Sequence, residues 1–204
     1  MSRPLVIDDI EDLRSYERGR DDYRRRVIDL KRRRRVAVGP FVTFVFENRE
    51  TVRFQVQEMA RAEKMMSDEQ IQGELDIYNA LLPSPDELSA TMFIELTDEA
   101  SLREWLPTLV GIERTVELRI AAPGAGPAPE ATVSRARPEE AHEEALTRPT
   151  MTASVHYIRF PVSPDQRRHL AAGPVVLAVT HPDYRFETTL SPETREELTT
   201  DLDR

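Results

Sequence analysis

The start of the chain combines a dense run of charge with a narrow apolar stripe. Residues 14–35 hold eleven Lys or Arg against four Asp or Glu, which gives this run a net charge of +7. Its apolar side chains recur at helical spacing: Leu13, Tyr16, Tyr23, Val27 and Leu30. The pattern predicts one long helix from Leu13 to about Arg34. Such a helix packs against the rest of the protein along its apolar stripe and leaves most of its surface in water.

The rest of the chain is acidic. The whole chain carries −9, so the residues outside 14–35 sum to −16. A basic helix on an acidic body can attract phosphates or an acidic partner, or it can pair with its own acids. We expect the cluster 32–35 to contact protein acids, in this chain or in a partner. The acidic remainder and the lack of interleaved aromatic side chains disfavour nucleic acid as the target.

Beyond this helix, short β-rich segments alternate with capped helices. Residues 41–46 predict a buried strand, and Asn48 is a good N-cap for a helix whose apolar stripe is Val52, Val56, Met59 and Met66. Further helices are expected from Ser67, Thr97, Pro164 and Ser191, strands at 88–96, 115–120, 154–162 and 175–179, and a hairpin turning at 181–183. The predicted fold class is α+β: a single domain over residues 1–204 with a mixed sheet, a long N-terminal basic helix, a C-terminal β-hairpin and a closing helix.

Residues 121–149 differ in composition from both flanks. They contain five prolines, two glycines and no aromatic residue, and four glutamates lie near their end. Such a composition buries too little apolar surface to offset the entropy of ordering the chain. We therefore expect a flexible insertion within the domain, with one weak helix at 138–146. We also expect the chain to fold without residues 124–147.

Several classes of protein are excluded or disfavoured. The chain has no cysteine, so it holds no disulfide, thiolate nucleophile or cysteine-bound zinc or iron–sulfur site. Residues 1–12 carry acids, and no segment reaches the ~20 apolar residues of a membrane helix, so we expect a cytoplasmic protein without membrane contact. Gly124 and Gly126 lack the third glycine of a dinucleotide loop, and no P-loop, GxSxG or HExxH motif is present. Common hydrolases, kinases and nucleotide oxidoreductases are therefore disfavoured, and whether the chain is an enzyme stays open.

A polar run follows directly after the first predicted strand. It consists of Glu47, Asn48, Arg49 and Glu50, with Arg53 and Gln57 on the next helical turns. A strand end that leads into a helix start suits an anion, and Arg49 and Arg53 lie one turn apart, where both can reach a carboxylate or phosphate. The equal alternative is that Asn48 only caps its helix and the arginines only pair with acids of the chain. Glu47 and Glu50 can pair with these arginines or bind a cation.

Three further residues have side chains suited to ligand binding. The four histidines are separated by 14, 13 and 12 residues, which is not the spacing of metal ligands on one helix. His156 shares a predicted strand face with apolar residues, whereas His181 and Tyr184 lie at the predicted hairpin turn. All three are candidate ligand-binding residues, and a metal site would require both histidines to converge with a carboxylate such as Glu47 or Glu95. The identity of any metal or cofactor is left open.

Five segments resemble a bacterial family of unknown function: residues 26–40, 46–59, 87–96, 155–160 and 181–184. Genes of that family often lie beside rubrerythrin and an iron–sulfur oxidoreductase resembling heterodisulfide reductase. The resemblance implies a setting of peroxide defence or electron transfer, with a redox protein as partner. Our leading hypothesis is therefore a non-catalytic accessory or interaction protein of an iron–sulfur or diiron redox system. The alternatives are an anion- or metal-binding enzyme that uses residues 47–53 and a nucleic-acid binder that uses residues 14–35, and the oligomeric state is left open.

Overall fold

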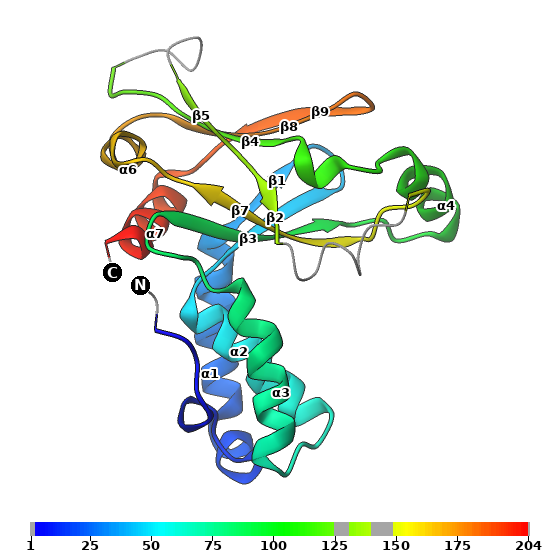
Figure 1. Cartoon of the computed structure of the whole chain (residues 1–204), viewed down its shortest axis with the longest axis vertical. Coiled ribbons are helices and arrows are strands. Elements are labelled where there is room, and N and C mark those ends of the chain that lie inside the picture. The colour runs from blue at the N-terminus through cyan, green and yellow to red at the C-terminus, as the bar shows by residue number, and fades with distance from the viewer. Residues whose placement is uncertain (1–2, 125–130, 140–148, 204) are drawn as a thin grey trace.

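Two antiparallel sheets face each other, and a layer of helices projects from the outer side of one of them (Figure 1). The computed structural model describes residues 3–124, 131–139 and 149–203. The larger sheet has the order β1 (Arg35–Val38), β2 (Val42–Glu47), β3 (Glu87–Ile94), β7 (Val155–Pro161) and β6 (Arg137–Pro138). The smaller sheet has the order β5 (Thr132–Arg135), β4 (Val116–Ile120), β8 (Val175–His181) and β9 (Tyr184–Thr189).

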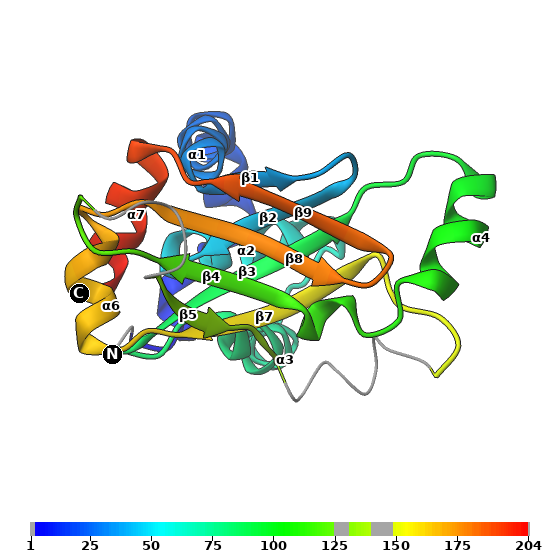
Figure 2. The same ribbon diagram turned by 90° about the horizontal axis from the view of Figure 1, so that it is seen from above.

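The helical layer lies below the larger sheet in Figure 1. It consists of α1 (Leu13–Arg34), α2 (Arg49–Ala62) and α3 (Asp68–Tyr78), with the short turns η1 (Ile7–Asp9) and η2 (Asn79–Leu81). Seen from above, shorter helices flank the sheets at opposite ends (Figure 2): α6 (Pro164–Leu170) and α7 (Pro192–Leu202) at one end, α4 (Glu99–Thr108) at the other, where η3 (Ile112–Arg114) leads into β4. Within the described residues, every helix is too short or too polar to cross a membrane.

The α+β class is confirmed, and so are elements that local signals predict. The basic helix spans Leu13–Arg34. Asn48 and Ser67 each accept backbone N–H groups of the helix that they start, and Ser191 does the same for the closing helix α7. The turn at 181–183 joins β8 to β9. These features depend only on residues close together in the chain.

Three details of the predicted fold are wrong. The strands form two antiparallel sheets and not one mixed sheet. The helix after Asn48 ends at Ala62, so Met66 lies beyond it and is 82% exposed, while Met65 is buried. The helix expected from Thr97 is capped by Asp98, whose side chain accepts the Ser101 N–H.

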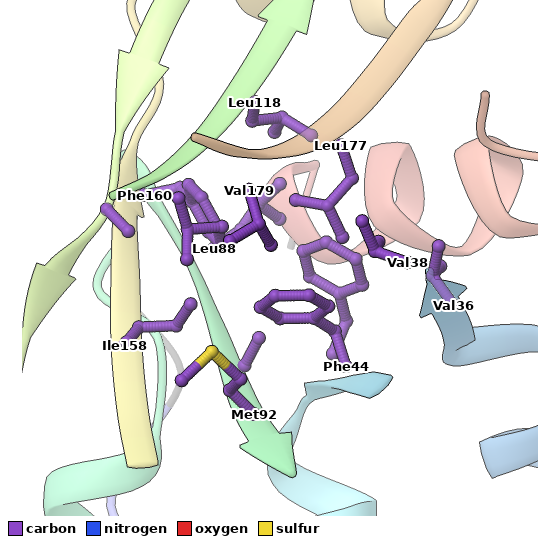
Figure 3. Packing of buried hydrophobic residues seen from close by; sticks show 14 of the residues in the cluster. Val36, Val38, Phe44, Leu88, Met92, Leu118, Ile158, Phe160, Leu177 and Val179 are labelled. Atoms are coloured by element: carbon purple, nitrogen blue, oxygen red, sulfur yellow. The ribbon is translucent and has the colours of Figure 1, made fainter. Parts of the chain in front are cut away.

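The main core lies between the two sheets (Figure 3). Alternate residues of the larger sheet point inward, among them Phe44, Met92 and Phe160, and they meet Leu118 and Leu177 of the smaller sheet. All five side chains are fully buried. Burying a side chain of this size contributes about 1.5–3 kcal/mol. Every residue of β2 is buried, because the helical layer covers its outer face.

The two sheets are connected along both edges. On one edge β5 and β6 form a single segment that pairs first with β4 and then with β7, and Ser134 donates a hydrogen bond to the Pro161 carbonyl at 2.6 Å. On the other edge the side chains of β9 reach the backbone of β1. Tyr184 donates to the Val38 carbonyl at 2.8 Å, and Thr188 donates to the Ala37 carbonyl at 2.7 Å. The sheets therefore enclose their core almost as a barrel.

Residues 121–149, expected to be a flexible insertion with one weak helix, contain two strands that we did not predict, β5 and β6. Residues 132–138 pair with both sheets, and the side chains of Ser134 and Ala136 are buried. The helix expected at 138–146 lies mainly outside the described residues. The segment is too short and too polar to show a strand pattern of its own, so its pairing is decided by the strands on either side. A deletion of residues 124–147 would remove both strands.

Strand β1 is also absent from the sequence-based interpretation. It forms a hairpin with β2 around Gly39, whose φ angle is +78°. A Cβ atom at this position would lie 2.5 Å from the Tyr184 hydroxyl. Both the left-handed backbone and the close approach of the tyrosine therefore require glycine. The Tyr184 hydroxyl also accepts the N–H groups of Val42 at 3.2 Å and Phe41 at 3.3 Å, which ties the hairpin to β9.

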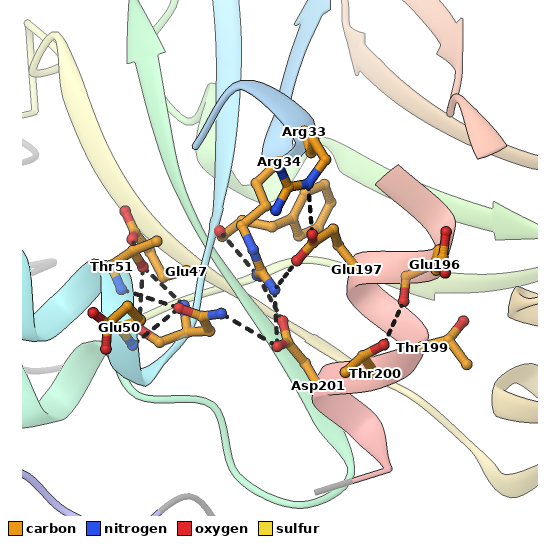
Figure 4. A network of polar contacts seen from close by, with 12 residues as sticks. Arg33, Arg34, Glu47, Glu50, Thr51, Glu196, Glu197, Thr199, Thr200 and Asp201 are labelled. Carbon is orange, nitrogen blue, oxygen red and sulfur yellow. Dashed lines mark hydrogen bonds and ion pairs between the residues drawn. The ribbon is translucent and has the colours of Figure 1, made fainter. Parts of the chain in front are cut away.

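A buried arginine connects the first long helix, α1, to the last helix, α7 (Figure 4). Arg34, at the last turn of α1, is only 1% exposed. Its guanidinium donates to Asp201 at 2.6 and 2.9 Å and to Glu197 at 3.0 Å, and both acids lie on the C-terminal helix α7. It also contacts the Phe46 carbonyl of β2 at 3.5 Å. One side chain thus connects α1, the larger sheet and α7.

Replacing this arginine should destabilise the whole fold. We expect Arg34→Met to lower the free energy of unfolding by about 3–5 kcal/mol, because Asp201 would remain buried and charged without its partner. The measurement is urea unfolding at neutral pH. Arg32→Met is the matched control, since its ion pair with Asp29 is exposed and worth about 0–1 kcal/mol. Equal unfolding midpoints for the two variants would contradict the assignment.

Candidate functional site

The strand–helix junction predicted to bind an anion is occupied by the chain's own groups. Glu47 is 3% exposed and accepts a hydrogen bond from Thr51 at 2.5 Å (Figure 4) and another from Thr91 at 2.7 Å. The Asn48 carbonyl oxygen accepts the N–H groups of Glu50 and Thr51 at 3.0 Å. The free amides at the start of α2 are therefore capped from within the chain.

The basic and amide side chains of the junction hold the N-terminal segment, residues 3–12. Arg49 bonds to the Asp9 carboxylate at 2.5 Å, and Arg53 Nε donates to the Asp9 carbonyl at 2.7 Å. Gln57 is fully buried; its Oε1 accepts the Glu11 N–H and its Nε2 donates to the Glu11 carbonyl, both at 2.9 Å. The hydrogen bond from Arg49 holds the pKa of Asp9 below its ordinary value.

The other predicted residues lie away from this junction and apart in the fold. His156 faces the inter-sheet core, with Nε2 at 2.8 Å from Thr152 Oγ1. His181 accepts the Asp183 N–H at Nδ1 at 3.2 Å, beside the β8–β9 turn. Tyr184 fixes the β1–β2 hairpin. Among the residues that the structure describes, no three His, Cys, Asp or Glu side chains are grouped so that they could hold a metal ion.

A polar pocket of about 320 Å³ lies beside the junction, between α1, α2 and the N-terminal segment. The first helix contributes one wall, and Glu50 and Arg53 of α2 with Glu11 contribute the other. The residues that line it are Glu11, Tyr16, Gly19, Asp22, Tyr23, Arg26, Glu50 and Arg53. Two of the predicted site residues, Glu50 and Arg53, therefore line this pocket. The sequence predicted only a packing role for the α1 side chains that line the opposite wall.

Tyr23 forms the floor between two cationic side chains. Its ring packs edge-on against Phe54 of α2 at 5.5 Å, and the guanidinium carbons of Arg26 and Arg53 lie 5.5 and 5.4 Å from the ring centroid. Its hydroxyl is buried and makes no hydrogen bond of normal geometry within the described chain, and the Glu50 carboxylate is close enough to interact with it. Burial, and then the nearby charge of Glu50, raise the pKa of this hydroxyl, so it stays protonated and able to donate.

A second polar group holds α1 against α2 behind this pocket. Arg20 donates two hydrogen bonds to the Glu58 carboxylate, at 2.8 and 2.7 Å, and the Tyr16 hydroxyl donates a third at 2.7 Å. The bidentate arginine is the main reason that the pKa of Glu58 lies below its ordinary value. The wall of the pocket is therefore fixed by an ion pair as well as by aromatic packing.

The basic residues of α1, with Arg35 that follows it, differ in whether an acid of the chain pairs with them. Arg33 pairs with Glu197 at 2.7 Å, Arg34 with Asp201, and Arg35 with Glu95 at 2.5 Å. Apart from Arg26 in the pocket, four cations of α1 make no ion pair with any described residue: Arg14, Arg18, Arg24 and Lys31. The expectation that 32–35 contacts protein acids is confirmed within the chain itself, with Arg32 paired to Asp29 of the same helix at 3.3 Å.

Comparisons with known proteins identify a family, and the function of that family is unknown. Residues 4–202 match a family described as "Protein of unknown function (DUF3501)". The chain is also similar to a crystal structure of a protein of unknown function from Burkholderia pseudomallei. The two share 33% sequence identity over 98% of this chain and 100% of that one, with a TM-score of 0.86. A comparison with curated proteins finds no match.

The contact between α2 and the N-terminal segment can be tested at Gln57. We expect Gln57→Met to release residues 5–11, because the Glu11 backbone would lose both of its partners on α2. Amide hydrogen exchange in this segment should become faster by about tenfold or more. Gln55→Met on the same helix is the control and should leave the exchange unchanged. Unchanged exchange in both variants would show that the segment is held by other contacts.

The lowered pKa of Glu58 predicts a pH dependence of stability. Above its ordinary pKa of 4.5, the carboxylate stabilises the fold; as the pH falls through the lowered folded-state pKa, the unfolded chain binds more protons and this stabilisation is lost. Glu58→Gln should therefore lower the free energy of unfolding at neutral pH by about 1–2 kcal/mol and flatten its fall between about pH 5 and pH 3. Urea unfolding over this range measures both effects. The exposed Glu69→Gln on α3 should leave the slope as in the wild type.

Proposed function

We propose a function from the surface side chains of this chain, which belongs to the DUF3501 family of proteins of unknown function. It is a non-catalytic interaction protein that docks an acidic protein partner along the outward face of α1. The observation that carries this proposal is a group of four cations along the solvent-facing sides of α1, Arg14, Arg18, Arg24 and Lys31, which make no ion pair with the described residues; the three arginines are exposed and Lys31 is half-buried.

The unpaired state of these cations is informative because the chain has acids in excess. Its net charge is −9, and the neighbouring cations Arg33, Arg34 and Arg35 are all neutralised by acids from distant parts of the chain. The outward face of α1 is oriented away from those acids. Its charge therefore remains available to steer and orient a partner of opposite sign.

An exposed apolar side chain lies within this charged face. Ile28 is 47% exposed, and it lies one helical turn from Arg24 on one side and from Arg32 on the other. Stable protein interfaces commonly bury an apolar centre inside a polar rim. This arrangement supports docking to a protein surface in which acidic groups surround an apolar contact.

The same face fits a nucleic acid less well. Glu17 and Asp21 lie among its cations, and the residues outside 14–35 sum to −16, so a polyanion would meet repulsion both locally and at long range. A protein partner can place cations opposite those acids. Nucleic-acid binding is therefore treated as the competing outcome of the test below.

The partner that we propose is a component of an iron–sulfur or diiron redox system or of peroxide defence. The support is the resemblance of residues 26–40 and 46–59 to a family whose genes neighbour rubrerythrin and an iron–sulfur oxidoreductase. The chain has no cysteine, so any iron–sulfur cluster in such a complex would belong to the partner.

Charge reversal on α1 tests this proposal. We expect the wild-type chain, cross-linked in its native cell and recovered by affinity, to retain one acidic redox protein at about 0.15 M salt. Binding of that purified partner should weaken by about tenfold or more in the triple variant Arg18→Glu, Arg24→Glu, Lys31→Glu. The control variant carries the same change in net charge on other faces: Arg103→Glu, Arg168→Glu and Arg185→Glu. Equal losses in both variants, or retention of nucleic acid with a steep salt dependence, would overturn the proposal.

A further inference from the structure

The pocket between α1, α2 and the N-terminal segment points to a ligand site separate from the docking face. We propose that it binds a small zwitterion, an amino-carboxylate whose carboxylate lies between Arg26 and Arg53 over Tyr23 and whose ammonium stays at the rim. This inference does not rest on the proposed docking function. Arg26 and Tyr23 line the pocket, whereas Arg18, Arg24 and Lys31 are not among its lining residues.

Three groups in the pocket can donate hydrogen bonds that the chain leaves unmade. Arg53 uses its Nε for the Asp9 carbonyl, while its terminal nitrogens lie 3.6 Å from Glu11 and 4.0 Å from Glu50, beyond hydrogen-bond range. Arg26 makes no ion pair with the described residues and contacts only the ring of Tyr23 among the interactions of its guanidinium. These donors suit the two oxygens of one carboxylate.

The tyrosine hydroxyl is the strongest single indication of a ligand. The side chain of Tyr23 is only 6% exposed, and its hydroxyl makes no hydrogen bond of normal geometry in the described chain, with the Glu50 carboxylate as the neighbouring acceptor. Buried polar atoms almost always have a partner, because leaving one unpaired forfeits its interaction with water. A carboxylate held by the two arginines would accept the hydrogen bond from this hydroxyl.

Acidic groups at the rim decide between an anion and a zwitterion. Glu11 and Glu50 are each 45% exposed, and Asp22 is 71% exposed, so all three reach solvent at the mouth of the pocket. Asp22 is paired with Arg25 of the same helix, so Glu11 and Glu50 offset the charge of the two guanidiniums and leave no net attraction for a simple anion. An ammonium group on the same ligand reverses this, because it places a positive charge next to the rim acids while the carboxylate occupies the interior.

Glycine at position 19 keeps the pocket open. Gly19 lies inside the 22-residue helix α1, where glycine is the least favourable residue apart from proline. A Cβ atom added there would meet nothing within 4 Å. No packing contact therefore requires glycine at this position, whereas a larger side chain would project into the space that the ligand needs.

The test replaces this glycine and measures binding directly. Gly19→Leu should close the pocket and also raise the melting temperature, because leucine favours helix. Gly73→Leu is the matched control: Gly73 also lies within a helix, α3, with nothing within 4 Å of an added Cβ, but it is remote from the pocket lining. Both variants should gain stability, and only the first should lose binding.

Binding is followed by the amide NMR signals of Gly19 and Tyr23 in isotope-labelled full-length protein. The probes are the common amino acids and γ-aminobutyrate, with propionate and propylamine as single-charge controls. We expect at least one zwitterion to give saturable shifts in the wild type and Gly73→Leu, with binding about tenfold or more tighter than either control. Tyr23→Phe, which removes only the hydroxyl, should weaken that binding by about tenfold.

Three results would overturn the proposal. The first is the absence of saturable shifts at Gly19 and Tyr23 with every zwitterion. The second is binding of propionate or propylamine as tight as that of the best zwitterion. The third is unchanged binding in Tyr23→Phe, a variant that serves even if Gly19→Leu fails to fold. If these variants lose zwitterion binding but still dock the protein partner, the proposed function stands. If the charge-reversal variant of α1 loses the partner but still binds the zwitterion, the ligand site stands without the docking function.

Discussion

The buried guanidinium of Arg34 is the constraint on which the rest of the arrangement depends. It lies where α1 turns into β1, and its acid partners Glu197 and Asp201 come from the last helix of the chain. A buried charge is tolerated only when it is paired and hydrogen-bonded, so α7 must lie against the end of α1. This contact fixes the direction in which α1 leaves the sheets and therefore where both faces of that helix point.

Polar contacts also build the helical layer that carries the two proposed binding surfaces. Glu58 holds α1 to α2 through Arg20, while Gln57 holds the N-terminal segment to α2 through the Glu11 backbone. The pocket lies between these two attachments, so its walls are positioned from both sides. A site held in this way is preorganised. Few side chains have to become ordered when a small ligand binds, so the entropic cost of binding is low.

The basic residues of α1 serve different purposes according to the direction in which they point. Those at its C-terminal end, such as Arg33 and Arg34, stabilise the fold through α7. Arg26 lines the pocket, and Arg18 and Arg24 face solvent on the outer side. One long helix can therefore contribute to the stability of the fold, to a ligand site and to a docking surface, because residues a few positions apart project in different directions.

Local signals in the sequence were enough to predict the extent of α1, the caps at Asn48 and Ser67 and the α+β class, because helical periodicity and capping act within a few residues. The pairing of β1 and the two-sheet switch at 132–138 depended on distant strands and could not be read locally. Of the candidate site, the sequence indicated Glu50 and Arg53 but not Tyr23, which looked like ordinary packing. Only the tertiary structure decided which cations were neutralised, since Arg34 finds its acid 167 residues away.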